Sequence, residues 1–511
     1  MSALTILSPG VYVQEVDRGT KPVEAVGTST AAFIGITAEA SEKTIDPATG
    51  LPRPILPAAL VNQPILVTSW TKYTEYFGGF LDGAYLPDAV YGYFANGGGA
   101  CYVTSLRALN EQGVFATVTV PTTSGKGKSF VVSAKSAGPG HNGLKVVIAT
   151  DKDGDKAKDT FTMTVGDESK SGLTMKSVEE ANYGNVIISG AGSGMPLDGT
   201  YELAGGGAPP LLSAADFVGD PGERTGLGGL EALDDVRLVL CPDVMVGYDG
   251  SDAAKERVKS IQSAVITHCQ NMRYRFAVLD TPPGLNAQKA KEWRNYVNFD
   301  TSYAALYYPW IRVADLSGSG NGSKLVPPSG HIVGIYNRSD AERGVHKAPA
   351  NEVVLSAIDL EINLSKADQD TLNPIGVNCI RAFTGRGIRV WGARTLSSDG
   401  SWRYINVRRL FILIGASLER GMQWVVFEPN DYTLWAKVRR DTSAFLRVIW
   451  RTGALFGNTP EMAFYVKCDE ELNPLEIRDL GQLIIEIGVA PVKPAEFVIF
   501  RISQWAGPNA V

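Results

Sequence analysis

The stretch LGQLIIEIGVAPVKPAEFVIFRISQWAGP, residues 480–508, decides how the rest of the chain is interpreted. It contains two runs rich in Ile, Val and Phe, residues 483–489 and 497–503, and this composition favours β-strands. The spacer 490–494 carries two prolines, which hold it extended. Because an unpaired strand of this kind would template aggregation, we expect each run to pair with a strand of its own domain or of a neighbouring chain.

The other end of the chain carries a similar run. Ser8-Pro9-Gly10 precedes a short strand-like segment, residues 11–16, and a polar Gly/Pro segment follows at 17–22. A chain with a strand behind a linker at each end can lend both strands to neighbours by β-augmentation. The predicted arm residues are Val11, Tyr12, Val13, Val16, Phe497, Val498, Ile499, Phe500 and Ile502, and the predicted acceptor strand contains Ile484, Ile485 and Ile487.

The composition is that of a globular protein rather than a disordered one. The 511 residues are 44% hydrophobic and 20% charged, and the formal net charge is −6. An acidic balance argues against nucleic acid as a direct partner. No apolar run is long enough to span a membrane, and we expect neither membrane insertion nor a secretory signal. The five cysteines stand singly, which predicts buried thiols in a chain folded in the cytoplasm.

Strand-like and helix-like segments alternate over two parts of the chain. The predicted strands are 30–37, 101–106, 236–241, 275–279 and 303–308, and the predicted helices are 70–77, 88–94, 251–269, 286–296 and 331–342. Near-continuous apolar strands between amphipathic helices indicate an α/β core with a parallel sheet and right-handed crossovers.

Between these two parts, residues 110–207 lack helical patterns. Short strands separated by Gly, Asp, Lys and Ser are predicted at 116–120, 130–134, 144–150, 161–165 and 185–189. This texture predicts an inserted all-β domain, a small sandwich or barrel.

From about residue 376 the pattern changes to α+β. Strands are predicted at 387–394, 402–406, 422–427 and 463–468, and helices at 407–420 and 431–452, the second capped by Asn430. On the second helix, basic residues recur at steps of three, seven and four and fall within about 80° of one another, at about 100° per residue. These residues are Lys437, Arg440, Arg447 and Arg451, while Leu434, Val438, Phe445 and Ile449 lie on a separate face.

Ten segments of the chain form a recognisable series. They are SPGVYVQEV (8–16), TAAFIG (30–35), RTGLGGLEALDDV (224–236), VPPSGHIVGIYNRSD (326–340), GVHKAPAN (344–351), VWGART (390–395), YINVRRL (404–410), FEPND (427–431), GALFGNTPEMAFYVKCD (453–469) and IGVAPVKPAEFVIFRI (487–502). In content and order they resemble the sheath proteins of contractile phage tails and related injection machines. The insertion resembles only the variable part of such proteins.

The resemblance implies a fold and a domain order. The expected parts are an N-terminal arm and linker (1–22), an α/β core of subtilisin-like topology (23–109 and 208–375), the inserted domain (110–207), an α+β C-terminal sheath domain (376–494) and a C-terminal arm (495–511). It also implies that the C-terminal domain lies innermost, so the basic stripe becomes the expected contact with an acidic inner tube.

The resemblance further implies a function without chemistry. Sheath subunits polymerise around an inner tube in an extended metastable state, then contract and drive the tube through a target envelope. The implied partners are copies of the chain, the tube, a baseplate and a tail terminator or cap. Assembly is expected in the bacterial cytoplasm, as part of a phage tail or a released tail-like particle such as a tailocin.

Few residues of the chain support an enzymatic alternative. A subtilisin-like hydrolase needs a Ser-His-Asp triad, yet the chain has only four histidines and no recognisable nucleophile segment. The Gly/Ser/Lys stretches 122–129 and 318–324 depart from the phosphate-loop pattern, and 151–155 lacks the glutamate of a calcium loop. No Cys/His spacing fits zinc. We therefore expect no enzyme and no cofactor or metal, and a multi-domain surface adhesin stays a further alternative.

Overall fold

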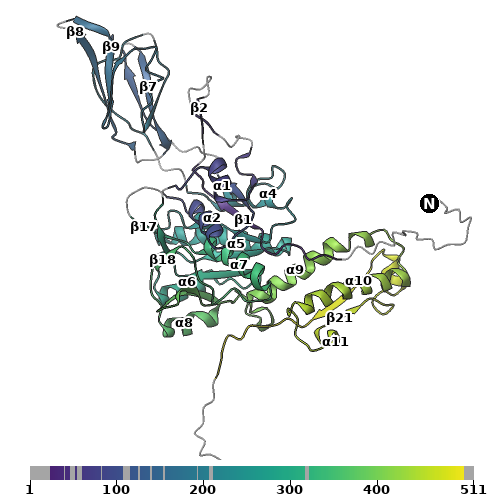
Figure 1. Cartoon of the computed structure of the whole chain (residues 1–511). Helices are drawn as coiled ribbons and strands as arrows, with labels where there is room; N and C mark the ends of the chain where they lie inside the picture. Colours follow the sequence, from purple (N-terminus) through teal and green to yellow (C-terminus); the bar gives the residue numbers. More distant parts are fainter. Residues whose placement is uncertain are drawn as a thin grey trace, which may run out of the picture. The chain divides into compact units, whose positions relative to one another are not determined.

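The computed structural model describes two compact units. The described residues are 23–38, 41–45, 52–54, 60–81, 83–106, 115–124, 127–137, 141–153, 156–192, 194–206, 211–316 and 322–499. The large unit comprises residues 27–343 and 347–408, and the small unit takes in the described residues of 1–26, 344–346 and 409–511. Figure 1 labels the elements of both units. Within the described ranges, no helix combines the length and apolar character needed to cross a membrane.

An eight-stranded sheet organises the large unit. From one edge of the sheet to the other, the strands are β20 (Gly387–Val390), β19 (Val377–Phe383), β15 (Ala304–Tyr308), β14 (Phe276–Asp280), β13 (Leu238–Leu240), β1 (Ala31–Gly35), β5 (Cys101–Ser105) and β4 (Pro64–Val67). The six inner strands pair in parallel, whereas β4 and β20 pair antiparallel at the two edges. The predicted parallel sheet is confirmed, and the antiparallel edge strands are an addition to it.

Helices cover both faces of this sheet, because side chains alternate along each strand. Phe33 of β1 meets Tyr93 of α2 edge to face, with ring centroids 5.3 Å apart. Its neighbours Ala32 and Ile34 belong instead to the core that includes α5 and α6. The helices are α1 (Trp70–Phe77), α2 (Leu86–Ala95), α5 (Asp252–Met272), α6 (Ala287–Val297), α7 (Ser329–Arg343) and α8 (Lys366–Leu372), with short α3 (Ala214–Val218), α4 (Gly226–Leu230), η3 (Pro242–Met245) and η4 (Asn373–Ile375). Ser251 caps α5 as predicted, accepting from the Ala254 N–H.

Glycines let α2 and α7 approach closely. A Cβ at Gly330 would stand 2.3 Å from the Ala89 carbonyl oxygen, and one at Gly334 would stand 2.5 Å from the Tyr93 carbonyl oxygen. The ring of His331 lies against Gly92 in the same contact. The segment Gly330-His331-Ile332-Val333-Gly334 is therefore a helix-packing motif, since only residues without a side chain fit this approach.

The stretch from residue 115 to residue 206 forms two antiparallel sheets around a core of its own (Figure 1). One sheet has the order β10-β9-β8-β12 and the other β11-β7-β6. The strands are β6 (Phe115–Pro121), β7 (Lys128–Ala137), β8 (Lys145–Asp153), β9 (Lys156–Val165), β10 (Glu168–Leu173), β11 (Val186–Ser189) and β12 (Gly199–Glu202). All five strands expected here are present. Strands β10 (ESKSGL) and β12 (GTYE) were not foreseen, because polar residues and glycine outnumber apolar residues in both.

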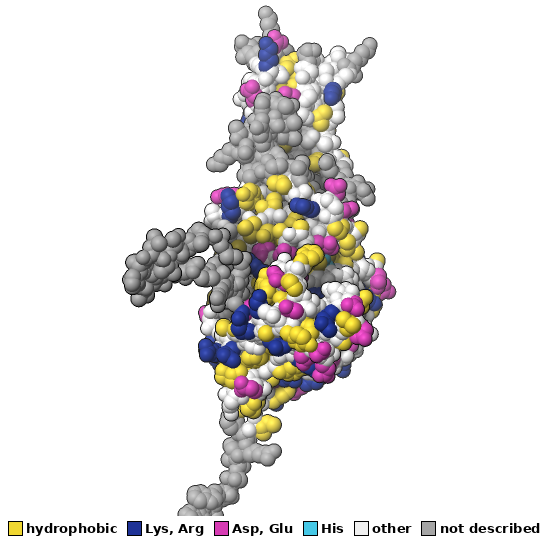
Figure 2. Space-filling model, turned by 90° about the vertical axis from the view of Figure 1, so that its right-hand side faces the viewer, with side chains coloured by type: hydrophobic (Ala, Val, Ile, Leu, Met, Phe, Trp, Pro, Cys, Tyr) yellow, Lys and Arg dark blue, Asp and Glu magenta, His cyan; other side chains and the backbone are white. Residues whose placement is uncertain are grey.

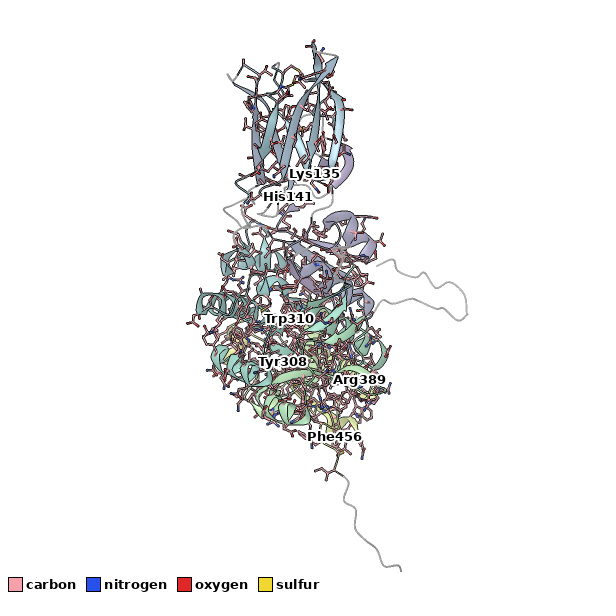
Figure 3. The ribbon with its side chains drawn as sticks, turned by 90° about the vertical axis from the view of Figure 1, so that its left-hand side faces the viewer. Lys135, His141, Tyr308, Trp310, Arg389 and Phe456 are labelled. Atoms are coloured by element: carbon pink, nitrogen blue, oxygen red, sulfur yellow. The ribbon has the colours of Figure 1, made fainter. Side chains whose placement is uncertain are left out.

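Two further sheets of the large unit were also unforeseen. Strand β16 (Ile311–Ala314) pairs antiparallel with β17 (Ser323–Val326) and β18 (Ala357–Leu360), and β2 (Ser41–Ile45) pairs with β3 (Pro52–Pro54). Buried aromatics adjoin the first of these sheets. The indole of Trp310 donates to the Thr281 carbonyl oxygen over 2.7 Å, and Tyr308 beside it is fully buried (Figure 3).

The small unit packs two long helices against a two-stranded sheet (Figure 1). Its elements are α9 (Ile405–Gly421, whose first turn belongs to the large unit), η6 (Gln423–Val425), α10 (Tyr432–Arg451), α11 (Pro460–Ala463), β21 (Phe464–Lys467), α12 (Leu475–Asp479) and β22 (Glu486–Val489). Asp431 caps helix α10 in place of the predicted Asn430, since the Asp431 carboxylate accepts from the Leu434 N–H.

Two strands predicted in this part of the chain are wrong. Residues 422–427 form η6 and a turn instead of a strand, as a short connection between two helices. Residues 402–406 lead from η5 (Gly400–Trp402) into α9, and only Tyr404 between them makes a β-bridge, with Arg394. In the first turn of α9 the Arg408 guanidinium lies 3.6 Å from the Trp402 ring centroid and 4.4 Å from that of Tyr303, an arrangement that attracts a cation.

Candidate subunit interface

The sheet of the small unit has only two strands. Strands β21 and β22 pair antiparallel, from Phe464 opposite Val489 to Lys467 opposite Glu486. Each strand thus pairs along one side, and its other side carries main-chain groups without a strand partner in the described part of the chain. An isolated two-stranded sheet is marginally stable, and its edges accept further strands. This sheet is the most open template for another strand in the small unit.

The two faces of this sheet differ. Phe464, Val466, Ile487 and Val489 pack against the core that α9 and α10 build. On the other face the Tyr465 ring, 54% exposed, covers Gly488, and its hydroxyl donates to the Glu486 carboxylate over 2.7 Å. The buried face fixes the register of the pair, while the edges stay accessible for backbone hydrogen bonds.

The acceptor strand predicted at residues 483–489 is shorter in the structure. Ile487 lies in β22, but Ile484 and Ile485 precede it in an extended segment outside the strand. The buried side chain of Asn473 takes the place of a strand partner there: its amide oxygen accepts from the Ile484 N–H over 2.6 Å, and its amide nitrogen donates to the Ile484 carbonyl over 3.0 Å. The sequence did not predict this role of Asn473, because its hydrogen-bond partner Ile484 lies eleven residues further along the chain.

The residues that follow β22 form backbone hydrogen bonds with the segment that follows α10. Val492 donates its N–H to the Ala454 carbonyl over 3.1 Å, and Phe456 donates to the Ala490 carbonyl over 2.8 Å. Beyond this point Phe497, Val498 and Ile499 are 71%, 69% and 80% exposed and lie in no strand. The remaining predicted arm residues, Val11, Tyr12, Val13, Val16, Phe500 and Ile502, lie outside the described residues.

The basic stripe predicted on α10 has the expected geometry. Lys437, Arg440, Arg447 and Arg451 are all exposed. The apolar face is buried, with Leu434, Val438, Phe445 and Ile449 at most 6% exposed. Helical periodicity alone therefore placed both faces correctly.

Acidic side chains offset part of the positive charge of the basic stripe. Arg440 pairs with Asp441 over 2.9 Å. The pKa of the Glu461 carboxyl, in α11, is lowered mainly by hydrogen bonds from its own backbone N–H and from Thr459. The charge of Arg447 lowers this pKa further, by a smaller amount. Lys437, Arg447 and Arg451 have no ion pair among the described residues, so they leave three cations for a partner.

Exposed apolar side chains accompany these cations. Val448 lies on the same face of α10, and Phe456 and Met462 follow close after the helix; all three are largely exposed. Phe456 is labelled in Figure 3. In the space-filling view, Lys and Arg side chains gather beside hydrophobic ones on the lower half of the molecule (Figure 2). Mixed basic and apolar surface is typical of protein interfaces rather than of inert surface.

Two of the four histidines, His331 and His268, are buried. His331 is 1% exposed, its Nε2 lies 3.1 Å from the Ser356 hydroxyl, and burial lowers its pKa to about 4. His268 contacts Arg275, and burial, more than the Arg275 charge, lowers its pKa to about 4. Across the described ranges, no three His, Cys, Asp or Glu side chains group to hold a metal ion. The five cysteines are free thiols, four of them buried as predicted.

Comparison with known proteins agrees with this picture. Residues 229–396 match the model of the phage tail sheath protein central domain, and residues 397–504 match that of the phage tail sheath C-terminal domain; together they cover more than half of the chain. The tail sheath protein of Vibrio phage KVP40 is 26% identical over 346 residues, which cover 62% of this chain and 48% of that protein. This chain thus spans about half of that relative.

Further similarities extend the match. A putative prophage major tail sheath protein of Pseudomonas aeruginosa strain UCBPP-PA14 is 26% identical over 309 residues, covering 58% of this chain and 75% of that protein. The contracted helical sheath of the anti-feeding prophage gives a TM-score of 0.60 at 23% identity, covering 98% of this chain and 100% of the other. The contracted PVC sheath complex of an extracellular contractile injection system gives 0.57 at 24% identity, covering 99% of each chain. This chain belongs to the contractile tail sheath protein family.

Proposed function

We propose that this chain is the structural subunit of a contractile sheath. Copies polymerise around an inner tube in an extended metastable state and contract to drive the tube through a target cell envelope. The free energy is stored at assembly as the difference between two packings of the same interfaces, so the subunit needs no catalytic site or cofactor. The observation that carries the proposal is the two-stranded sheet β21–β22 of the small unit, in a chain of the sheath family.

Strand exchange is the proposed link between copies. The N-terminal residues 11–16 and the C-terminal residues 497–503 of neighbours add to the outer sides of β21 and β22, near Ile487. Main-chain hydrogen bonds supply the affinity in such β-augmentation, and they tolerate rotation of the domains that the arms connect. The exposed Phe497, Val498 and Ile499 support this role, because a strand of that composition gains from being covered.

The exposed stripe of α10 is the proposed contact with the tube. Lys437, Arg440, Arg447 and Arg451 would face acidic groups of the tube, through contacts worth about 0.2–1 kcal/mol each while exposed. Weak contacts suit this role, since the sheath must release the tube when it contracts. A baseplate and a terminator or cap are the proposed partners at the ends of the sheath.

We also propose an arrangement of domains along the chain. The α/β core (23–109 and 208–375) is proposed to have subtilisin-like topology, the β-rich insertion (110–207) to face outward, and residues 376–494 to form the inner sheath domain between arms at 1–22 and 495–511. Assembly takes place in the bacterial cytoplasm, and the product is part of a virion or a released tail-like particle. The comparisons favour neither the hydrolase nor the adhesin considered from the sequence.

Electron microscopy of the purified assembly tests the function. Particles prepared with the cognate tube and baseplate should show striated, tube-filled sheaths, and a second population that is shorter, wider and empty after a contraction stimulus. Separate globular particles with no striation under the same conditions would contradict the proposal.

A further inference from the structure

A pocket of about 550 Å³ opens in the large unit. It lies beyond the carboxyl ends of β13 and β14, where the loop through Tyr248 and the loop through Pro283 meet α5 and α6. Ligands of open α/β sheets bind at this edge, outside the carboxyl ends of parallel strands. The volume falls within the range of about 300–1,000 Å³ that is usual for small-molecule sites.

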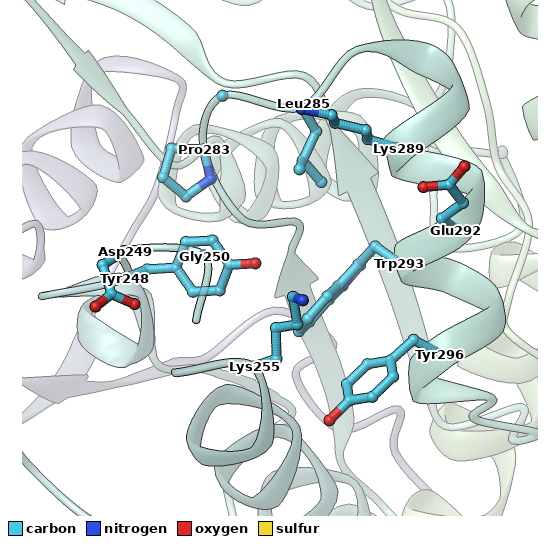
Figure 4. A pocket seen from close by; sticks show the side chains of 11 residues that line it. Tyr248, Asp249, Gly250, Lys255, Pro283, Leu285, Lys289, Glu292, Trp293 and Tyr296 are labelled. Carbon is cyan, nitrogen blue, oxygen red and sulfur yellow. The ribbon is translucent and has the colours of Figure 1, made fainter. Parts of the chain in front are cut away.

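Aromatic side chains form the walls of this pocket (Figure 4). The rings of Tyr248 and Trp293 meet edge to face, with centroids 6.3 Å apart and planes at 84°. The ring of Tyr296 is tilted by 36° from Trp293, at a centroid distance of 5.7 Å. Leu285 adds an aliphatic surface. Three rings with an aliphatic neighbour offer a broad apolar surface on which a ring with C–H faces can lie.

Polar groups of both kinds surround these rings. Lys255 and Lys289 bring hydrogen-bond donors, and Asp249 and Glu292 bring acceptors, so the formal charges of the lining cancel. Figure 4 shows the Tyr248 hydroxyl and the Lys255 ammonium directed toward the space between α6 and the Pro283 loop. Lys255 also pairs with Asp252 over 2.9 Å, which holds it at the rim.

One buried donor of the lining lacks an acceptor. The indole N–H of Trp293, a residue 4% exposed, has no hydrogen-bond partner among the described residues. A buried N–H is usually paired, and an unpaired one calls for an explanation. An oxygen atom of a bound molecule within reach of this N–H would supply the missing acceptor.

We propose that this pocket binds a neutral pyranose ring. The C–H face of the sugar lies on the Tyr248 and Trp293 rings, and its hydroxyls accept from Lys289 and Tyr248 and donate to Asp249 and Glu292. A polyhydroxylated neutral ring satisfies donors and acceptors together. An organic cation would meet Lys255 and also Lys259, whose ammonium already lies 4.8 Å from the Tyr296 ring centroid. An anion would meet the two carboxylates, so neither suits the lining as well.

Ligand-observed saturation-transfer NMR on the full chain tests this inference. The probes are the methyl glycosides of glucose, galactose, mannose and N-acetylglucosamine, presented one at a time. At least one should receive saturation, with the ring protons of one face receiving most. Tyr248→Ala should weaken binding about tenfold, because it removes one aromatic wall. Tyr432→Ala, an exposed tyrosine of the small unit, is the matched control and should leave binding unchanged.

Trp293→Phe separates binding from folding. It keeps an aromatic ring and removes the unpaired N–H, so affinity should fall while the melting temperature stays the same or rises. Absence of saturation transfer to all four glycosides would overturn the proposal. So would binding that survives both Tyr248→Ala and Trp293→Phe. Sheath assembly is scored separately by microscopy, so failure here leaves the proposed function standing, and failure there leaves this site standing.

Discussion

The two units of this chain contain sheets of opposite character. The large unit's eight-stranded sheet is covered by helices on both faces, and its strands β1, β5, β13, β14 and β15 are buried almost throughout. The small unit's sheet has two strands, one face on the core and one face exposed around Tyr465. The large unit is thus held by its own packing, whereas the small unit offers unpaired strand edges. The difference shows that stability within the chain and a proposed contact between copies can depend on separate sheets of one polypeptide.

A substitution in the α2–α7 contact should have the largest effect on the large unit. In Gly330→Ala the new methyl group meets the Ala89 backbone at 2.3 Å, and both helices must shift. We expect the free energy of unfolding to fall by about 3 kcal/mol in chemical denaturation. Gly79→Ala, where a Cβ meets nothing within 4 Å, is the control and should change it by less than about 0.5 kcal/mol. Equal effects at both positions would contradict the tight packing.

A buried carboxyl gives the large unit a pH dependence. Burial raises the pKa of Asp280 from 3.8 to about 7, while its carboxylate accepts from the Ser329 N–H over 2.9 Å. Between pH 4 and 7 the folded state therefore binds the proton more than the unfolded state, and this group's contribution to stability is lost as pH rises.

Asp280→Asn keeps the acceptor and removes the titration. Relative to wild type, the variant should gain stability as pH rises from 4 to 7, by up to about 1.4 kcal/mol per pH unit, measured by denaturation at each pH. Asp252→Asn, at a side chain 99% exposed, is the control for the substitution itself. A stability difference between Asp280→Asn and wild type that stays constant over this range would contradict the assignment.

The same atomic overlap should matter less in the small unit. A Cβ at Gly488 would stand 2.1 Å from the Tyr465 ring, as close as the overlap at Gly330. Here the obstacle is an exposed ring that can turn away, so Gly488→Ala should lower the free energy of unfolding by less than about 1 kcal/mol. A loss as large as that of Gly330→Ala would show that the small unit is as rigid as the large one.

Reversing charge on α10 should affect folding least of all. Arg447→Glu with Arg451→Glu alters exposed side chains, so we expect less than about 0.5 kcal/mol in the free energy of unfolding. Assembly around tubes should nevertheless fail, or give contracted, empty sheaths in electron micrographs. Lys145→Glu with Lys152→Glu, exposed on strand β8, changes the net charge equally and should assemble normally. Tube-filled extended sheaths from the α10 variant would exclude the stripe as the attachment surface.

Local patterns predicted much of the fold. The buried strand β1, the Ser251 cap of α5 and the two faces of α10 follow from residue periodicity and capping, which act within a few residues. The false strand at 422–427 shows the limit: Trp424, Val425 and Val426 have strand character, but they pair with no strand among the described residues.

Other features depend on residues distant in sequence. Gly330 and Gly334 matter because α2 packs against them. The Arg408 guanidinium in the first turn of α9 likewise lies over the rings of Tyr303 and Trp402. Asn473 substitutes for a strand at Ile484 through hydrogen bonds that no local pattern signals. Within the candidate interface, the sequence therefore indicated the basic stripe and β22 but overextended the acceptor strand.

The central claim is that the small unit's sheet is completed by strands from neighbouring copies. Deleting residues 495–511 tests it most directly, with the truncated and full-length chains compared by electron microscopy and thermal denaturation under one assembly condition. We expect the truncated chain to be folded, to melt at the same temperature as the full-length subunit, and to form no sheath. Deletion of residues 1–17 should have the same effects. Sheaths of normal length and striation from the truncated chain would contradict the account.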